Sequence, residues 1–341
     1  MDAVVMRRGH APAGEAERGR RAGVYAALDL GTNNCRLLIA RATRDGFQVI
    51  DSFSRVVRLG EGLHASGRLS EAAQDRAVAA LWACAQKLRR REVTLARSVA
   101  TEACRRAANG PAFIERVYRE TGIALDVITS AEEARLAVLG CQALIDPCGG
   151  QALVFDIGGG STELMLVDPC APPGQDVLAW TSLPWGVISL AETEPGHFDT
   201  ADERLAAYGR MHGRVTAAMA RFRETCEALR SGGLQLVGTS GTVTTLAALH
   251  LGLPAYDRRQ VDGCHVPVGE MRAVGLRLAA QSVAERAKAP TIGPDRADLI
   301  VAGCAILEAI LSTWPEPMLR VADRGIREGI LRTLIARDAG F

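Results

Sequence analysis

The sequence has almost no net charge and no long run of apolar residues. Its 341 residues include 40 Lys and Arg against 39 Asp and Glu, so the chain has no overall field that would attract nucleic acid or a membrane surface. No apolar stretch approaches the roughly 20 residues that a membrane-spanning helix needs. We therefore predict neither a nucleic-acid nor a membrane partner, and any anion-binding site must be local.

The patterns typical of disulfides, metal sites and secretion are also missing. The nine cysteines are scattered, odd in number and never in Cys-x-x-Cys spacing, which favours free thiols in a reducing compartment, by default the cytoplasm. The six histidines form no His-Glu-x-x-His motif. Residues 1–22 are rich in Arg, Ala and Gly but lack the apolar stretch of a signal peptide, so we predict a disordered tail there.

The sequence does contain a regular series of strand and helix patterns. At 341 residues and 48% apolar, the chain is long enough for two domains. The predicted elements are strands 24–30, 34–40 and 47–59, helix 70–91 with Ser70 as N-cap, strand 93–101, helix 111–122, strand 124–129 and helix 130–145. Three strands in a meander are thus followed by alternating helices and strands, which predicts parallel strands with crossover helices.

The segment "DPCGG" at 146–150 interrupts this series, and strand patterns begin again after it. We therefore predict a first domain at 23–146 and a second at 147–341.

The second series begins by repeating the first strand, turn and strand. "AALDLGTNNCRLLIA" aligns with "LVFDIGGGSTELMLV" at a constant offset of 127, which places Asp29 on Asp156 and Gly31 on Gly158. Glycines allow positive φ and close approach, so such a turn can point backbone N–H groups at one phosphate. An aspartate beside each turn would repel phosphate unless a cation lay between them, which predicts Mg²⁺ or Mn²⁺ near Asp29 and Asp156.

These turns resemble the two phosphate motifs of the actin, sugar-kinase and heat-shock-chaperone ATPase superfamily. "LVGTSGTVTTLAALHL" (236–251) occupies the place of the third glycine motif of that superfamily. From about residue 24 onward the chain resembles the Ppx/GppA family of exopolyphosphatases and guanosine pentaphosphate phosphohydrolases. The more specific matches are "VATEACRRAANG" (99–110), "ITSAEEARLAVLG" (128–140) and "RGIREGIL" (324–331).

The resemblance implies an α/β fold of two actin-like (ribonuclease H-like) domains with the active site in the cleft between them, and a C-terminal helix that can pack back on the first domain. It also implies that Glu133 is the general base and that Glu163 joins Asp29 and Asp156 at the metal. The implied substrate contacts are the two turns, the third glycine motif and two arginines: Gly31, Thr32, Asn33, Asn34, Gly158, Gly159, Gly160, Ser161, Thr162, Gly238, Thr239, Ser240, Gly241, Arg58 and Arg105.

Each of these residues also has a structural explanation. "SAEE" (130–133) fits a capping box, in which Ser130 and Glu133 satisfy each other's backbone donors, and spacing alone favours that role for Glu133. Arg105 could belong to a solvated helix face, and Glu163 could lie on the exposed face of a strand. The two turns could be ordinary hairpin turns, although their duplication and paired aspartates favour phosphate binding.

Three functions from different classes remain at this stage. The first is hydrolysis of terminal phosphate from inorganic polyphosphate or the 5′-γ-phosphate of pppGpp, with polyphosphate or a guanosine penta- or tetraphosphate as the bound partner. The second is a small-molecule kinase of the same superfamily, and the third is a nucleotide-binding sensor or filament protein without turnover. A homodimer is compatible with all three.

Overall fold

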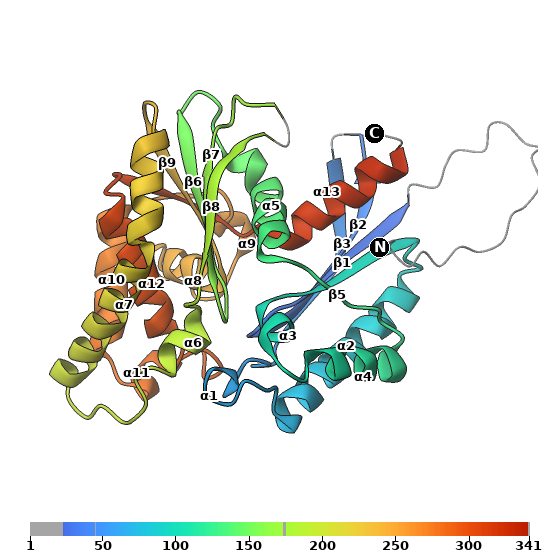
Figure 1. The fold of residues 1–341 in the computed structure, drawn as a ribbon, viewed down its shortest axis with the longest axis horizontal. Helices are drawn as coiled ribbons and strands as arrows, with labels where there is room; N and C mark the ends of the chain where they lie inside the picture. Colours follow the sequence, from blue (N-terminus) through green and yellow to red (C-terminus); the bar gives the residue numbers. More distant parts are fainter. Residues whose placement is uncertain (1–22, 45, 173–174, 340–341) are drawn as a thin grey trace, which may run out of the picture.

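The computed structural model describes residues 23–44, 46–172 and 175–339, and the predicted tail at 1–22 lies outside them. Two separate β-sheets follow one another along the longest axis, and helices are packed against both (Figure 1). Among the described residues, no helix is long and apolar enough to cross a membrane.

The first sheet has the strand order β3-β2-β1-β4-β5. Its strands are β1 (Val24–Leu30), β2 (Asn34–Thr43), β3 (Gly46–Val56), β4 (Leu95–Ala100) and β5 (Asp126–Val127). β1 is antiparallel to β2 and parallel to β4, so a meander is followed by a crossover, as predicted. Helices α2 (Glu71–Arg90) and α4 (Gly110–Thr121) share an apolar core with one face of this sheet. Ser70 is the N-cap of α2, accepting from the Ala73 amide.

The second sheet repeats this arrangement and extends it by one strand, with the order β8-β7-β6-β9-β11-β10. Its strands are β6 (Gln151–Ile157), β7 (Thr162–Val167), β8 (Val177–Leu183), β9 (Leu234–Thr239), β10 (His265–Pro267) and β11 (Met318–Ala322). β6 is antiparallel to β7 and parallel to β9, as β1 is to β2 and β4. The repeat seen in the sequence is therefore a repeat of topology.

The remaining helices of the second half cover this sheet. They are α6 (Val187–Ala191), α7 (Ala201–Leu229), α8 (Gly241–His250), α9 (Arg258–Val261), α10 (Val268–Ala280), α11 (Val283–Ala287) and α12 (Ile300–Thr313). α12 is almost entirely buried, which explains why its sequence is apolar on all sides.

Two helices fill the space between the two sheets. α5 (Ser130–Cys141), with the 3₁₀ turn Gln142–Leu144, and α13 (Ile326–Ala339) share an apolar core with residues of both sheets (Figure 1). A Cβ on Gly140 would lie 2.0 Å from the Gly325 carbonyl oxygen, and one on Gly329 would lie 2.1 Å from that of Leu136. Glycine is thus required for the close crossing of these helices.

Several elements differ from the sequence prediction. β3 ends at Val56 rather than at 59, because the Val57 and Arg58 amides turn to donate to the Asn33 carbonyl at 2.8 and 3.0 Å. β5 has two residues rather than six. Short helices α1 (Leu63–Ser66) and α3 (Glu102–Arg106) lie in segments where no helix was predicted.

Candidate active site

The β1–β2 and β6–β7 turns have the same backbone hydrogen bond. The Gly31 amide donates to the Asn34 carbonyl at 2.9 Å, and the Gly158 amide donates to the Ser161 carbonyl, also at 2.9 Å. Each turn follows a strand that ends in the sequence Asp followed by an aliphatic residue, so both aspartates reach the same end of their sheets. The two turns are equivalent in backbone as well as in sequence.

The triple glycine of the second turn is explained by packing between the turns. None of Gly158, Gly159 and Gly160 has a positive φ, so backbone freedom, which the sequence analysis proposed, is not the reason for them. A Cβ on Gly159 would lie 2.7 Å from the Asn33 nitrogen, and one on Gly160 would lie 3.0 Å from Thr32 Oγ1. The first turn therefore lies directly against the second, and side chains there would force the two turns apart.

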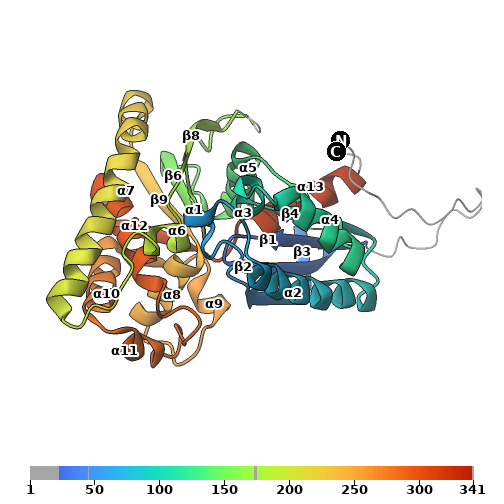
Figure 2. The same ribbon diagram turned by 60° about the horizontal axis from the view of Figure 1, so that its bottom comes forward.

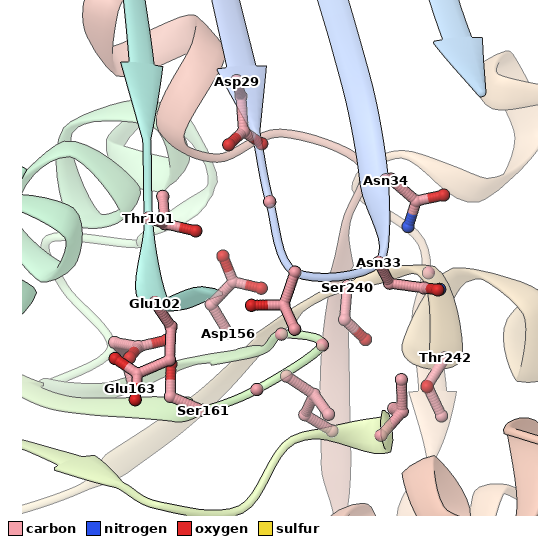
Figure 3. A pocket seen from close by; sticks show the side chains of 18 of the residues that line it. Asp29, Asn33, Asn34, Thr101, Glu102, Asp156, Ser161, Glu163, Ser240 and Thr242 are labelled. Carbon is pink, nitrogen blue, oxygen red and sulfur yellow. The ribbon is translucent and has the colours of Figure 1, made fainter. Parts of the chain in front are cut away.

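The two turns line a cleft of about 860 Å³, a volume that includes space open to solvent. Figure 3 shows the acidic side chains of Asp29, Asp156, Glu102 and Glu163 on one side of the first turn. On the other side lie Asn33 and Asn34, with Ser240 and Thr242 at the start of α8 below them in this view. The cleft thus has an acidic part and a part lined by amides and hydroxyls.

Glu133 projects from the first turn of α5 into the acidic part of this cleft. The predicted capping box is wrong: Thr129 is the N-cap, and its hydroxyl accepts from the Glu132 amide at 3.2 Å. Glu132 instead pairs with Arg97, at 2.6 Å. The Glu133 side chain is therefore not needed for capping. Although it is only 7% exposed, it lines the cleft.

Burial raises the pKa of Glu133 well above its ordinary value. The neighbouring carboxylate of Glu163 raises this pKa further, and Arg105, whose Nη1 lies 3.2 Å from Glu133 Oε2, opposes the rise. A carboxylate with a raised pKa is a stronger proton acceptor once ionised, which suits a general base.

Arg105 is held among acceptors rather than on a solvated face. Its guanidinium donates to the Ile128 carbonyl at 2.7 Å, to Glu133 at 3.2 Å and to Glu102 at 2.5 Å. It does not itself line the cleft. In this arrangement Arg105 contacts two cleft carboxylates, and the substrate contact expected of it stays a prediction.

The three predicted metal residues also meet here, and burial raises the pKa of each. For Asp156, burial and the nearby Glu163 carboxylate raise the pKa to about 7. Glu163 is fully buried, and its pKa is raised by burial but held down by hydrogen bonds from Ser161 and Ser182. Arg36 opposes the rise at Asp29. The carboxylates that line this cleft thus outnumber the arginines that line it.

This donor set fits Mg²⁺ or Mn²⁺ shared with a substrate, rather than a metal enclosed by protein. Oδ1 of Asp29 is buried and lacks a hydrogen-bond partner among the described residues, so it is free to approach a cation. Within the same residues, no three His, Cys, Asp or Glu side chains are arranged to hold a metal by themselves. Mg²⁺ is typically held by one or two carboxylates together with waters and phosphate oxygens.

Most of the predicted site residues line the cleft. They are Asp29, Gly31, Thr32, Asn33, Asn34, Glu133, Asp156, Gly158, Gly159, Gly160, Ser161, Glu163, Ser240 and Gly241.

The other predicted residues, with Arg105, lie outside the cleft lining. Thr162 and Thr239 use their hydroxyls to hold backbone carbonyls, those of Trp185 at 2.7 Å and Arg324 at 2.6 Å. Gly238 lies within β9, where a Cβ would be 2.6 Å from the Phe155 ring. Arg58 forms an ion pair with Asp298.

Sequence analysis missed several polar residues of the cleft: Arg36, Thr101, Glu102, Thr242 and Arg296. Arg36 occupies the position equivalent to Glu163 at the offset of 127. The repeat could therefore have identified Arg36 as a site residue. A Cβ on Gly241 would lie 3.5 Å from Arg36 Nη2 and 3.6 Å from Arg296 Nη1. Two guanidinium groups, one from each half of the chain, thus meet near the N-terminus of α8.

The repeated sheet topology and the cleft between equivalent turns define a two-domain, actin-like α/β protein with a site suited to phosphate. Comparisons with known proteins identify it further. The family model described as "Ppx/GppA phosphatase family" matches residues 38–337. The chain therefore belongs to the Ppx/GppA phosphatase family, a family of hydrolases.

Individual relatives agree with this assignment. Exopolyphosphatase 2 of Mycobacterium tuberculosis (strain CDC 1551 / Oshkosh) is 33% identical, over 91% of this chain and 98% of that protein. The crystal structure of an exopolyphosphatase from Cytophaga hutchinsonii has a TM-score of 0.82 at 25% identity, covering 92% of this chain and 98% of the other. The Aquifex aeolicus family member has a TM-score of 0.73 at 30% identity, covering 93% and 98%.

Proposed function

We propose that the protein is an exopolyphosphatase that hydrolyses the terminal phosphate of inorganic polyphosphate, the 5′-γ-phosphate of pppGpp, or both. The observation that supports this proposal most strongly is the position of Glu133. Glu133 lies in a buried acidic cluster at the start of α5, which it does not cap. It lines the same cleft as the β1–β2 and β6–β7 turns, which we call the phosphate-type turns. The curated relative named Exopolyphosphatase 2 supports the polyphosphate substrate.

In the proposed reaction, the two turns and the α8 N-terminus hold the terminal phosphate through backbone amides and hydroxyls. Arg36 and Arg296 add positive charge beside them. Glu133 orients a water molecule and accepts its proton as the water attacks the terminal phosphorus, while Arg105 fixes the position of the Glu133 carboxylate. Asp29, Asp156 and Glu163 are the carboxylates that would hold Mg²⁺ or Mn²⁺, one or two of them together with waters and phosphate oxygens, and the bound cation would supply charge neutralisation among the phosphate oxygens.

A small-molecule kinase is the alternative within the same superfamily, and a nucleotide-binding sensor is the alternative without turnover. A kinase would pass the phosphoryl group to an acceptor hydroxyl, so release of inorganic phosphate without an acceptor would distinguish it from the hydrolase. A sensor would bind a phosphate compound without consuming it.

Phosphate release from polyphosphate of defined lengths and from pppGpp, measured side by side with Mg²⁺, tests the proposal. We expect release from at least one of them, and the ratio of the two kcat/KM values assigns the preferred substrate. Absence of release from both, with intact binding, would overturn the hydrolase and favour the sensor.

All nine cysteines lie within the described residues and are free thiols. Because disulfides form in oxidising compartments, nine unpaired cysteines support our proposal that the protein works in a reducing compartment, the cytoplasm.

A further inference from the structure

A short segment of the first domain extends to the second domain at the edge of the cleft. We call residues 58–66, which follow β3 and include α1, the bridging segment. Its start is fixed to the first phosphate-type turn: the Arg58 amide donates to the Asn33 carbonyl at 3.0 Å, and the Gly60 amide donates to the Thr32 carbonyl at 2.9 Å. Any movement of the bridging segment is thereby coupled to that turn.

The same segment also contacts the second domain. Arg58 forms a two-pronged ion pair with Asp298, in which Nη1 and Nη2 each lie 2.7 Å from a carboxylate oxygen. Nη2 also donates to the Asp295 carbonyl at 3.0 Å. The Gly62 amide donates to Glu192 Oε1, just after α6, at 2.7 Å. Both ribbon views place α1 beside α6, in agreement with these bonds (Figures 1 and 2).

The backbone of Arg58 is held in an unusual conformation. Its φ is +47°, a left-handed value that costs a residue with a side chain some energy and persists only where the surroundings fix it. Arg76 of α2 supplies part of that support, since it donates to the carbonyls of Val57 at 2.9 Å and of Arg58 at 3.2 Å. The conformation is thus built into the first domain and does not depend on the ion pair.

The other connection between the domains is much firmer. The chain passes from the first sheet to the second through α5 and returns through α13, and these helices cross at glycines within one shared apolar core. Relative rotation of the domains would therefore pivot at α5 and α13. The bonds that such a rotation would break first are the polar ones at the bridging segment.

We propose that Asp298 is a positioning residue that acts through Arg58: the pair fastens the bridging segment to the second domain and holds the cleft closed. Asp298 also lies two residues after Arg296, which lines the cleft, so the same pair fixes the segment that presents Arg296. This explains why Arg58 lies outside the cleft lining although its segment borders the first turn. The ion pair is partly exposed, with side chains 26% and 42% accessible, so its effect is limited.

Hydrogen exchange without substrate tests this proposal directly. In the Asp298→Asn variant, the peptide containing the Gly62 amide should exchange about three- to tenfold faster than in the parent, because a bidentate pair is stronger than an ordinary surface pair. The matched control is Asp75→Asn, which removes a similar Arg–Asp pair, with Arg116 at 2.6 Å, inside the first domain. The control should leave that exchange unchanged. Equal exchange in Asp298→Asn and the parent would overturn the proposal.

Kinetics provide a second readout, and only this one rests on the proposed function. With polyphosphate as the probe, Asp298→Asn should raise KM about three- to tenfold and leave kcat within about twofold. Without the ion pair, part of the binding energy of the substrate is used to close the cleft, so the apparent affinity falls. A loss of kcat with unchanged KM would contradict a positioning role.

Salt provides a third test, in which each protein is compared with itself at low and high salt. Salt near 1 M, where the Debye length is about 3 Å, should speed the exchange of the Gly62 peptide in the parent but not further in Asp298→Asn. An equal salt effect in both proteins would count against the ion pair. If hydrogen exchange behaves as expected but no substrate is hydrolysed, the proposed function fails and the positioning role stands.

Discussion

The β1–β2 and β6–β7 hairpins have the same turn hydrogen bond but residues of opposite charge at one equivalent position. In the first, Asp29 is paired across the strands with Arg36, and in the second, Asp156 is paired with Glu163, the residue at the equivalent position. Burial raises the pKa of both aspartates. Arg36 opposes the rise at Asp29, whereas at Asp156 Glu163 adds to the rise and Arg36 opposes it. A duplicated scaffold thus holds two phosphate-type turns, one beside a cation and one beside an acidic pair.

The turns also differ in bulk, and the two differences are complementary. The first has Thr32, Asn33 and Asn34 where the second has Gly159, Gly160 and Ser161. The side chains of the first turn occupy the space that the glycines of the second leave empty. This divergence lets both turns line one cleft, with Glu133 in its acidic part.

The largest expected effect is that of removing the divalent cation, because Asp156 faces Glu163 across the strands of its hairpin, whereas Asp29 faces Arg36. Excess chelator should reduce phosphate release to background, and added Mg²⁺ or Mn²⁺ should restore it. Phosphate release that continues at its full rate in chelator would show that the acidic hairpin acts without a metal.

Glu133→Gln should lower turnover by at least ~10²-fold, because an amide cannot accept a proton from water. Its melting temperature should stay within a few degrees of the parent, since Thr129 and not Glu133 caps α5. Glu132→Gln, on the same turn of the helix and paired with Arg97, is the matched control and should retain turnover. If both variants turn over like the parent, the base lies elsewhere, with Glu163 the next residue to test.

The sequence predicted the sheets, the repeat and the polar ends of both hairpins, because these depend on local periodicity and turn composition. It could not show that Gly159 packs against Asn33, since that contact joins residues 126 positions apart. Spacing alone favoured a capping role for Glu133 because Ser130 and Glu133 fit the capping-box pattern. The structure uses Thr129 as the N-cap instead, and local spacing does not decide at which of two neighbouring hydroxyl residues a helix starts. Arg296 was missed because no local pattern marks an arginine that lies near Gly241, a residue 55 positions away in the sequence.

Gly159→Val should weaken substrate binding about tenfold or more, in line with the ~1–3 kcal/mol that overpacking costs. The added side chain would separate the two hairpins, because a Cβ there already meets the first turn. KM for polyphosphate measures the effect. Gly213→Val, on an open face of α7 where no atom lies near the added Cβ, serves as control and should bind normally. An unchanged KM in Gly159→Val would mean that the turns need not touch.

The smallest effect concerns stability without ligand or metal. The pKa of Asp156 is about 7 in the folded protein against an ordinary value of 3.8, so the folded state binds the proton more tightly. The free energy of unfolding therefore falls as pH rises between about 4 and 7. Asp156→Asn, which does not titrate, should gain a few degrees in melting temperature over the parent from pH 5 to pH 8. A constant difference would show that Asp156 does not have this raised pKa.

The central claim is that water, activated in this cleft, attacks the terminal phosphorus. It is tested most directly by running the reaction in ¹⁸O-labelled water and analysing the products by mass spectrometry. We expect one ¹⁸O atom in each released phosphate and none in the shortened chain or nucleotide. Label in the shortened product, or phosphate released without label, would contradict the account.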